Sequence, residues 1–588
     1  MQSRGTKRPV RRSADVRLLS IALLFIGAWL TIAYQLFQIQ VVDYREYTAA
    51  AERQRIRVEE TGAARGTIYD RQGRELAVSI EARSIYANPR QVVDAAAAAL
   101  ALSDALGLDI DRLREKLLAD TTFVFLARQV EVAEAEAVEA LNLPGVHFLN
   151  EPKRVYPSGS LAAHAVGFVN VDSQGIEGLE AQYNDLLTGI PGHILAERAA
   201  GGQVIPHGRF EVEPAVPGAD LVISIDREIQ FMAHRACVET VVTTNAKRCT
   251  VVALDPFTFE ILAMVVVPSF DPSDRTEQDI ANGTLTNAAV RSLYEPGSTQ
   301  KAVTISAALE EGVVDWDTQY LVYDSIEIVN GACTNQGEDG ENAIFGCYTD
   351  FSAHPPEVMT VRDCVRLSSN VCTVKIGQAL GRDRLREYLD AFGYGSSTGV
   401  DFPGEALGTV NLPTSCSTCP ASAAIGYSIS VSPLQMASVY ATIANGGLRM
   451  EPRLVSGVVT TDGVTRQPAP TSTRVISEDT ARRVRLMLKS VVDSGTGVKA
   501  AVPGYTVGGK TGTTRMFDFD LGRYSDEYVA SFVGMAPVDH PRLVMAVVVD
   551  APNSGEPVAA RTGGVVAAPL FSRVMEGSLH QMGVGPDA

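Results

Sequence analysis

The decisive stretch of this chain reads Tyr294-Glu295-Pro296-Gly297-Ser298-Thr299-Gln300-Lys301 and runs into the apolar segment Ala302-Val303-Thr304-Ile305-Ser306-Ala307-Ala308-Leu309. The Pro-Gly pair signals a turn and Gly312 ends the apolar segment, so we expect Ser298 at the start of a buried helix. Lys301 follows one turn later on the same face. Because burial disfavours a charged amine, Lys301 should be neutral and able to take the proton of the serine hydroxyl.

A second string, Ser368-Ser369-Asn370, lies in a stretch from Val361 to Ile376 that is predicted to be helical or to link two helices. A helix cap is the alternative interpretation of its last two residues. It also offers a second hydroxyl and a side-chain amide, and it falls between the first string and a third. We therefore expect it in the same site as the first string.

The third string, Lys510-Thr511-Gly512-Thr513, ends a predicted strand and precedes two more, at 528–535 and 543–549. The glycines around it indicate either a bulged strand or an edge that a substrate backbone approaches closely. The main-chain amides of Thr513 and Ser298 would then form an oxyanion hole. Together the three strings supply what acyl transfer through a serine ester needs.

The composition fits a large enzyme with an additional module. A length of 588 residues suggests about four domains, and 46% apolar residues suffice for a buried core. The 51 basic residues are outnumbered by 69 acidic residues, for a net charge of −18. This balance argues against nucleic acid as a partner.

A membrane anchor is predicted near the N-terminus. Residues 1–17 form a basic tail, and residues 18–38 are long and apolar enough to cross a hydrocarbon core of roughly 30 Å as a helix. The basic flank places the N-terminus in the cytoplasm and the remaining chain outside. A cleaved signal peptide would need small residues at its exit, and a buried core helix would not carry this flank, so a single-pass anchor is favoured. The basic residues are Arg4, Lys7, Arg8, Arg11, Arg12 and Arg17, against Asp15 alone.

All eight cysteines follow the predicted anchor, as expected for an oxidising compartment. Cys333 and Cys347 bracket a polar loop that a disulfide would close. The string Cys416-Ser417-Thr418-Cys419 favours a local disulfide over half a zinc site or a redox pair, because no second C-x-x-C or histidine cluster accompanies it. Cys364 and Cys372 flank the second string at helical spacing and are predicted to be small buried packing residues. The sequence does not settle the pairing.

A distinct module, residues 39–218, separates the anchor from the catalytic strings. Within it, Arg65–Ala77 predicts a strand, an Asp-x-x-Gly turn and a second strand, and Asp94–Leu141 is predicted to be helical. His164 is expected to be a structural histidine rather than a ligand. The catalytic domain is expected at 219–578, with 579–588 as a C-terminal tail.

The three strings resemble those of the penicillin-binding proteins and serine β-lactamases, whose acyl-serine site is built from S-x-x-K, S-x-N and K-T-G. The resemblance implies catalytic roles for four residues: Ser298 as nucleophile, Lys301 as its proton acceptor, Ser368 as a proton relay toward the leaving amine, and Asn370 as the holder of the substrate amide. Which group acts as acylation base is argued over within this superfamily.

The same resemblance assigns substrate binding to the third string. Lys510 and Thr511 would bind a terminal carboxylate, with Gly512 and Thr513 completing the strand edge. The implied fold is α+β, with an antiparallel sheet flanked by helices in the transpeptidase domain, on an elongated α+β N-terminal module. Neither a metal nor an organic cofactor enters chemistry of this kind.

Further strings resemble class B penicillin-binding proteins. Arg65–Ala77, Arg154–Phe168 and Gly175–Glu180 are similar to their non-catalytic module, and Gly426–Ala437 is similar to a segment of their transpeptidase domain. The sequence of residues Val169–Gly178 resembles the division (FtsI) type more than the elongation type. The chain departs from the type in Thr514-Arg515-Met516-Phe517 and in the loop between Cys333 and Cys347, which leaves the contacts of these loops open.

The resemblance implies a D,D-transpeptidase that attacks the penultimate D-alanine of a peptidoglycan stem peptide and cross-links it to a neighbouring strand. β-Lactams would acylate Ser298 and remain attached, because no counterpart of the deacylating glutamate of class A β-lactamases is recognised. The implied partners are nascent peptidoglycan, a septal glycosyltransferase and other division membrane proteins, with the catalytic domain on the periplasmic side of the inner membrane. The open alternatives are an elongation-type transpeptidase, a membrane-bound β-lactamase or D,D-carboxypeptidase, and a non-enzymatic sensor or scaffold.

Overall fold

The computed structural model describes residues 12–197, 205, 208–333, 346–460, 463–518 and 523–588. The chain divides into two compact units, one within residues 1–63 and 190–216 and the other within 64–189 and 217–588. All three catalytic strings belong to the second unit. The site is therefore built inside one compact body.

The first unit contains the predicted anchor. The segment Asp15–Val42 is unburied, and among the described residues it is the only helix long and apolar enough to cross a membrane. The predicted anchor, 18–38, falls within it, whereas Arg4, Lys7, Arg8 and Arg11 of the basic tail lie outside the described residues. Three antiparallel strands form a sheet in the order β1–β10–β11. The elements are α1 (Arg12–Phe37), the π-helical turn η1 (Gln38–Val42), α2 (Tyr44–Arg55), β1 (Ile56–Thr61), β10 (Gly192–Glu197) and β11 (Phe210–Glu213).

The second unit begins with a small α+β subdomain around its own apolar cluster. Three helices pack with a sheet in the order β5–β4–β6. The prediction of a helix over 94–141 is wrong in its middle, because β5 pairs with β4 and sends Leu126 into the cluster beside Ile85. The elements are β4 (Arg83–Ala87), η2 (Pro89–Gln91), α3 (Ala95–Leu106), α4 (Ile110–Leu117), β5 (Val124–Val130), α5 (Val132–Ala140) and β6 (Val146–Asn150).

A six-stranded sheet joins segments far apart in the sequence, in the order β23–β22–β12–β2–β3–β7. The predicted hairpin at 65–77 is confirmed, since the Asp70 carboxylate accepts hydrogen bonds from the amides of Gln72 and Arg74, both at 2.9 Å, across the turn. The strands are β2 (Ile68–Tyr69), β3 (Glu75–Ile80), β7 (Lys153–Val155), β12 (Asp220–Ile223), β22 (Val455–Thr460) and β23 (Gly463–Arg466).

A buried ionic cluster joins three segments of the N-terminal module. Glu180, which is fully buried, accepts hydrogen bonds from Arg65 Nε at 2.5 Å and from Arg154 Nε at 2.7 Å. Arg65 precedes β2 and Arg154 lies within β7, so one carboxylate links three segments. Nearby elements are η3 (Gly159–Ala162), α6 (Ala163–Val166), β8 (Phe168–Val169), β9 (Gly175–Glu177), α7 (Gly178–Gln182) and α8 (Asn184–Leu187).

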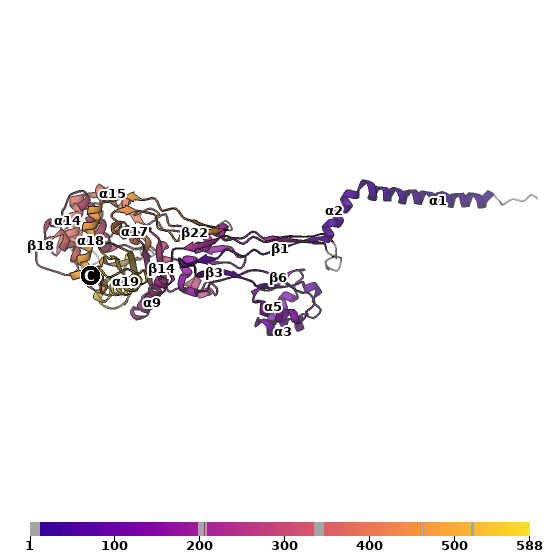
Figure 1. Ribbon diagram of the computed structural model, residues 1–588, viewed down its shortest axis with the longest axis horizontal. Helices are drawn as coiled ribbons and strands as arrows, with labels where there is room; N and C mark the ends of the chain where they lie inside the picture. Colours follow the sequence, from indigo (N-terminus) through magenta and orange to yellow (C-terminus); the bar gives the residue numbers. More distant parts are fainter. Residues whose placement is uncertain (1–11, 198–204, 206–207, 334–345, 461–462, 519–522) are drawn as a thin grey trace, which may run out of the picture. The chain divides into compact units, whose positions relative to one another are not determined.

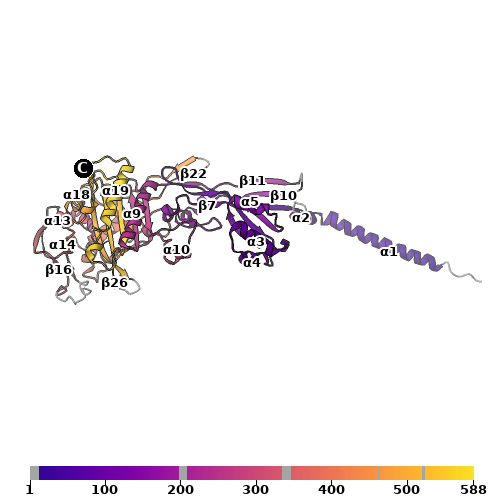
Figure 2. The ribbon, with the colours of Figure 1, turned by 90° about the horizontal axis from the view of Figure 1, so that it is seen from below.

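The catalytic domain is organised around a five-stranded antiparallel sheet in the order β14–β13–β27–β26–β25. Successive residues of β13 point to opposite faces. Val251 and Ala253 pack with α9 and α19, which lie side by side (Figures 1 and 2), whereas Val252 and Leu254 join the cluster that contains α17. The predicted antiparallel sheet flanked by helices is confirmed. The elements are α9 (Arg227–Thr244), β13 (Arg248–Leu254), β14 (Ile261–Val267), α17 (Pro433–Ala444), β25 (Gly508–Asp518), β26 (Arg523–Ala536), β27 (Leu543–Asp550) and α19 (Ala567–Gln581).

The remaining helices and short strand pairs complete the catalytic domain. The helices are α10 (Glu277–Ala281), α11 (Ala288–Arg291), η4 (Gly297–Gln300), α12 (Lys301–Glu310), α13 (Val361–Arg366), α14 (Asn370–Leu380), α15 (Arg382–Phe392), α16 (Cys419–Ala424), α18 (Glu478–Ser494), η6 (Val498–Ala500) and η7 (Val558–Arg561). The strands are β15 (Gln319–Val322), β16 (Ser325–Glu327), β17 (Cys347–Thr349), β18 (Glu357–Thr360), β19 (Thr409–Val410), β20 (Ile429–Ser430), β21 (Leu448–Arg449) and β24 (Thr473–Arg474).

All eight cysteines form disulfides. The two bridges favoured by the sequence, Cys333–Cys347 and Cys416–Cys419, are confirmed, although residues 334–345 of the first loop lie outside the described residues. Cys364 and Cys372 are fully buried, as predicted, but they are not separate packing residues, since they are bonded to each other with their α-carbons 5.8 Å apart. A continuous helix would hold them about 12 Å apart, but the chain turns between α13 and α14. The Cys237–Cys249 bridge was not predicted.

The expectation for His164 is confirmed. The side chain is buried and donates a hydrogen bond from Nε2 to the carbonyl oxygen of Thr284 at 2.8 Å. Burial lowers the pKa of His164 to about 4, so the ring stays neutral at physiological pH. It packs edge-on against Phe270 and therefore has a structural role.

Candidate active site

Ser298 lies in the 3₁₀ turn η4, immediately before α12, as the turn-then-helix pattern predicted. Gly297 has a φ of +53°, and its amide donates a 3.1 Å hydrogen bond to the carbonyl of Gly426. The Thr299 carbonyl accepts a hydrogen bond from the Tyr440 hydroxyl at 2.9 Å. These contacts fix the turn on both sides of Ser298, which is itself half-buried and open to a ligand.

Lys301 is fully buried at the start of α12. Its amine donates hydrogen bonds to the Ser368 carbonyl and to Asn370 Oδ1, both at 2.7 Å. Burial lowers the pKa of Lys301 to about 7, against the opposing attraction of Asp350. With this pKa a substantial fraction of the Lys301 amine is neutral at physiological pH.

Ser368 occupies the link between α13 and α14 with a φ of +62°, the left-handed region that serine rarely adopts. This conformation sends its carbonyl to Lys301 and its hydroxyl to Lys510, whose amine donates to it at 2.8 Å. The same hydroxyl lies 3.4 Å from the Lys301 amine. One serine therefore bridges the two lysines that the sequence placed in separate strings.

Lys510 and Thr511 lie on the edge strand β25. Burial and the neighbouring Lys301 hold the pKa of Lys510 well below its usual range. The Thr511 hydroxyl lies 2.8 Å from that of Thr496. An amine and two hydroxyls thus converge beside Ser368, where they are placed to bind an anion.

The glycines of the third string serve close packing within the protein. A Cβ at Gly512 would approach the Ser531 hydroxyl to 2.4 Å and the Pro296 carbonyl to 3.0 Å, and one at Gly509 would meet the Phe532 ring at 2.5 Å. The irregularity in the pairing of β25 with β26 falls later, between Arg515 and Phe517. A bulge at the glycines is therefore not their explanation.

Asp350 is a site residue that the sequence did not reveal. Its carboxylate accepts hydrogen bonds from the amides of Asn370 at 2.5 Å and Val371 at 3.1 Å, and from the Ser369 hydroxyl at 2.8 Å. An anion at the first turn of α14 suits the positive end of the helix. His354 donates to the Pro355 carbonyl and, at 3.1 Å, to the Asp350 carboxylate, and these two contacts raise the pKa of His354.

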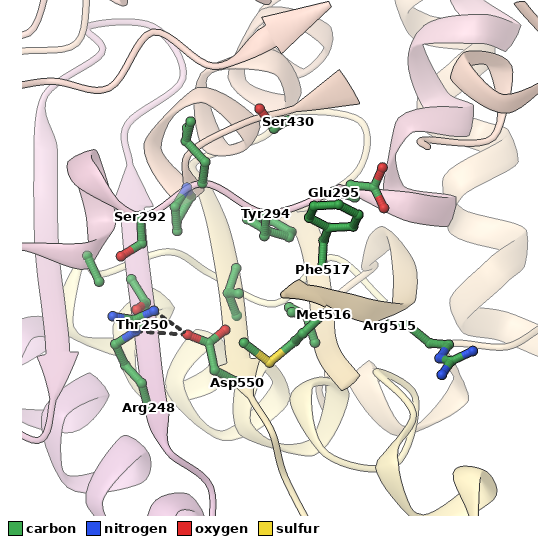
Figure 3. A pocket seen from close by; sticks show the side chains of 15 residues that line it. Arg248, Thr250, Ser292, Tyr294, Glu295, Ser430, Arg515, Met516, Phe517 and Asp550 are labelled. Carbon is green, nitrogen blue, oxygen red and sulfur yellow. Dashed lines mark hydrogen bonds and ion pairs between the residues drawn. The ribbon is translucent and has the colours of Figure 1, made fainter. Parts of the chain in front are cut away.

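A cavity of about 100 Å³ lies between the residues before the first string and those after the third (Figure 3). The ion pair of Arg248 with Asp550, at 2.6 Å, lies at one side of it. Burial raises the pKa of Glu295, which accepts a 2.7 Å hydrogen bond from the Tyr524 hydroxyl. Among the described residues no cluster of three or more His, Cys, Asp or Glu side chains is placed to hold a metal ion.

Two family models match the chain. The transpeptidase domain of penicillin-binding proteins matches residues 249–576, and the penicillin-binding protein dimerisation domain matches residues 60–223. The first match alone covers more than half of the sequence. The two matches lie in the order in which the sequence placed module and catalytic domain.

Similar proteins cover nearly the full length. The chain is 33% identical to the peptidoglycan D,D-transpeptidase FtsI of Escherichia coli (strain K12), over 99% of this chain and 95% of that protein. It is 35% identical to the penicillin-binding protein PbpB of Mycolicibacterium smegmatis, over 96% and 90%. Penicillin-binding protein 3 of Mycobacterium tuberculosis, solved in complex with aztreonam, superposes with a TM-score of 0.67 at 29% identity, over 90% and 98% of the two chains. With these matches and the three catalytic strings gathered around one buried lysine pair, the chain belongs to the class B penicillin-binding proteins.

Proposed function

We propose that this chain is a D,D-transpeptidase of the division type, in which Ser298 is the nucleophile and Lys301 the base that activates it. The observation that carries the proposal is the state of the Lys301 amine, whose pKa is about 7. A neutral amine has two N–H groups and one lone pair. Because its two short hydrogen bonds go to the Ser368 carbonyl and Asn370 Oδ1, the lone pair is left for the serine proton.

The acylation step follows from this arrangement. The Ser298 oxygen attacks the carbonyl of the penultimate D-alanine, and its proton moves to Lys301. The C–N bond to the terminal D-alanine then breaks, and the proton passes from Lys301 through the Ser368 hydroxyl to the leaving amine. The 3.4 Å separation of Lys301 and Ser368 Oγ supports this path. The main-chain amides of Ser298 and Thr513 stabilise the oxyanion.

Lys510 and Thr511 bind the terminal carboxylate of the stem peptide, on the strand edge that Gly512 and Thr513 continue. The lowered pKa of Lys510 supports this role, because an arriving carboxylate supplies the negative partner that restores the charged amine. Asn370 holds the substrate amide. Its position is supported by the Thr349 carbonyl, which accepts from Asn370 Nδ2 at 2.8 Å.

In the second step an amine of a neighbouring stem peptide attacks the Ser298 ester, forms the cross-link and returns a proton to the serine. β-Lactams acylate the same hydroxyl, and the ester persists because no residue at the site is assigned to its hydrolysis. The names of the similar proteins, a peptidoglycan D,D-transpeptidase and a structure with bound aztreonam, support this substrate and inhibitor class.

We assign residues 1–17 to a cytoplasmic tail, 18–38 to a single-pass inner-membrane anchor and 39–218 to the non-catalytic module. Residues 219–578 form the catalytic domain on the periplasmic side, and 579–588 end the chain. The basic N-terminal flank supports this orientation. The partners in this setting are a septal glycosyltransferase and other division membrane proteins.

Mass spectrometry of the full-length protein in detergent tests the chemistry. After benzylpenicillin treatment we expect one stable adduct, mapped to the peptide that contains Ser298 and absent from Ser298→Ala. Attachment to another residue would overturn the assignment, and rapid release of hydrolysed antibiotic would favour a β-lactamase. With a stem pentapeptide and an acceptor amine, D-alanine release without a cross-linked product would favour a carboxypeptidase.

Depletion and complementation in cells test the division role. Ser298→Ala should fail to support septation and give filaments, whereas rounding of the cells would favour the elongation alternative. A Ser298→Ala protein that sustains septation would favour the non-enzymatic scaffold.

A further inference from the structure

A disulfide closes the loop that contains Ser368. Cys364 lies in the last turn of α13 and Cys372 in the first turn of α14, eight positions apart in sequence. Their α-carbons are 5.8 Å apart, and both side chains are fully buried. The bridge therefore joins two helices directly beneath the turn that separates them.

Two hydrogen bonds of Ser369 also connect the two ends of this loop. The Ser369 amide donates to the Cys364 carbonyl at 3.0 Å, and the Ser369 hydroxyl accepts from the Cys372 amide at 3.0 Å. Between these contacts Ser368 is held at a φ of +62°, a left-handed conformation that is strained for a residue with a Cβ. Such a conformation persists only where its surroundings impose it.

The left-handed conformation of Ser368 brings it into contact with both lysines of the site. Ser368 gives its carbonyl to Lys301 at 2.7 Å and receives a hydrogen bond from Lys510 on its hydroxyl at 2.8 Å. We propose that the Cys364–Cys372 disulfide is a positioning device that holds Ser368 between Lys301 and Lys510 for acylation. The proposal rests on the function proposed above, in which Ser368 relays the proton.

Loss of the bridge would change the position of Ser368 but leave Ser368, Lys301 and Lys510 themselves in place. Without the covalent link the turn can relax to a right-handed φ, which moves the Ser368 carbonyl away from Lys301 and the hydroxyl away from Lys510. The Ser368 contacts serve the proton path, whereas Lys510 and Thr511, which bind the carboxylate, are held by the separate strand β25. We therefore expect the acylation step to slow while binding is retained.

The burial of both sulfurs argues for a permanent link rather than a redox switch. A reductant reaches a fully buried disulfide only when the surrounding helices open. In the folded protein the bridge stays closed, and the compartment that oxidises the other three bridges keeps it formed.

The test compares full-length variants in detergent. Cys364→Ala/Cys372→Ala removes the link, and Cys364→Val/Cys372→Ala removes it while refilling part of the buried volume. The matched control is Cys237→Ala/Cys249→Ala, which deletes an equally buried disulfide between α9 and β13. Stopped-flow acylation by a fluorescent penicillin gives the limiting acylation rate and the dissociation constant separately, at a series of pH values.

We expect the two site variants to lose about ten- to hundredfold in the limiting acylation rate, as a misplacement near 1 Å does, with the dissociation constant changed by no more than about twofold. Their pH profile should shift, because Lys301 loses the Ser368 carbonyl. The control should lose comparable thermal stability with an unchanged rate and profile. Wild-type rates and profile in both site variants, as in the control, would overturn the proposal.

Two further results keep the outcomes separate. Should neither site variant fold, stepwise reduction and alkylation mapping of the wild type decide: loss of acylation must follow opening of Cys364–Cys372 and not of Cys237–Cys249, and the reverse order would overturn the proposal. If wild-type protein is not acylated at Ser298, the proposed function has failed. An acylated wild type with equally fast site variants is the failure of this inference alone.

Discussion

Lys510 donates a 2.8 Å hydrogen bond to the hydroxyl of Ser368, although the two residues are 142 positions apart in the chain. The carbonyl of the same serine accepts from Lys301, so two buried amines meet at one residue. Burial lowers the pKa of both amines, and Lys301 lowers the pKa of Lys510 further. Burial thus disfavours charge on both amines, and a carboxylate bound beside Lys510 would favour its charged form.

Acylation should depend on the protonation of Lys301. Because only the neutral amine accepts the serine proton, the acylation rate should fall as pH drops through about 7 and level off above it. Lys301→Arg keeps a positive charge at every accessible pH and should lower the rate by about 10²–10⁴-fold without restoring it at high pH. The measurement is the acylation rate by a fluorescent penicillin between pH 5 and 9. Lys489→Arg, at a half-buried lysine paired with Asp493, is the control. A flat profile in the wild type would contradict the assignment.

Asp350 should tune this pH dependence. Its negative charge favours protonated Lys301, so Asp350→Asn should lower the pKa of Lys301 and move the acid limb of the acylation profile to lower pH. The variant also loses charge-assisted hydrogen bonds to the amides of α14, which should cost about 1.5–3 kcal/mol of folding stability.

Asp363→Asn is the matched control for Asp350→Asn, because Asp363 lies in the first turn of α13 and bonds Thr360 and Arg366 there. It should lose stability without moving the profile. A shift of the acid limb to higher pH in Asp350→Asn would show that the carboxylate acts on Lys301 in another way.

Local sequence signals predicted the catalytic core well. A Pro-Gly turn followed by apolar residues is enough to place Ser298 before a buried helix, and burial alone accounts for a neutral Lys301. The strands β26 and β27 were also recognisable, because two long apolar runs separated by a turn are typical of paired buried strands.

Features that depend on tertiary contact were missed. β5 lies in an Ala- and Glu-rich region, and only its pairing with β4 selects a strand there. Asp350 contacts Ser369, which lies 19 positions further along the chain, with β18 and α13 between them. The Cys364–Cys372 bridge requires the turn at Ser368, whose left-handed backbone no helical spacing rule anticipates.

The Glu180 cluster should dominate the stability of the module. Removing the carboxylate in Glu180→Ala leaves two buried guanidinium groups without their partner, which should cost about 3–5 kcal/mol of unfolding free energy. Denaturant unfolding of the full-length protein in detergent measures it. Glu228→Ala breaks the half-exposed pair with Arg74 and should cost at most about 1 kcal/mol. Equal losses in both variants would refute a structural role for the buried cluster.

Gly426 should control the turn that presents Ser298. It has a φ of +92°, and a Cβ there would lie 2.0 Å from the Gly297 carbonyl oxygen, so Gly426→Ala must displace the backbone next to the nucleophile. We expect acylation to fall about ten- to hundredfold, because the serine is moved relative to Lys301. The control is Gly583→Ala, which introduces alanine at a φ of +66° with no atom within 4 Å of the new Cβ. It therefore has the backbone strain but no steric clash. Penicillin acylation rates of the two variants separate the effects. If Gly426→Ala acylates as fast as Gly583→Ala, then the contact with Gly297 does not set the position of the nucleophile.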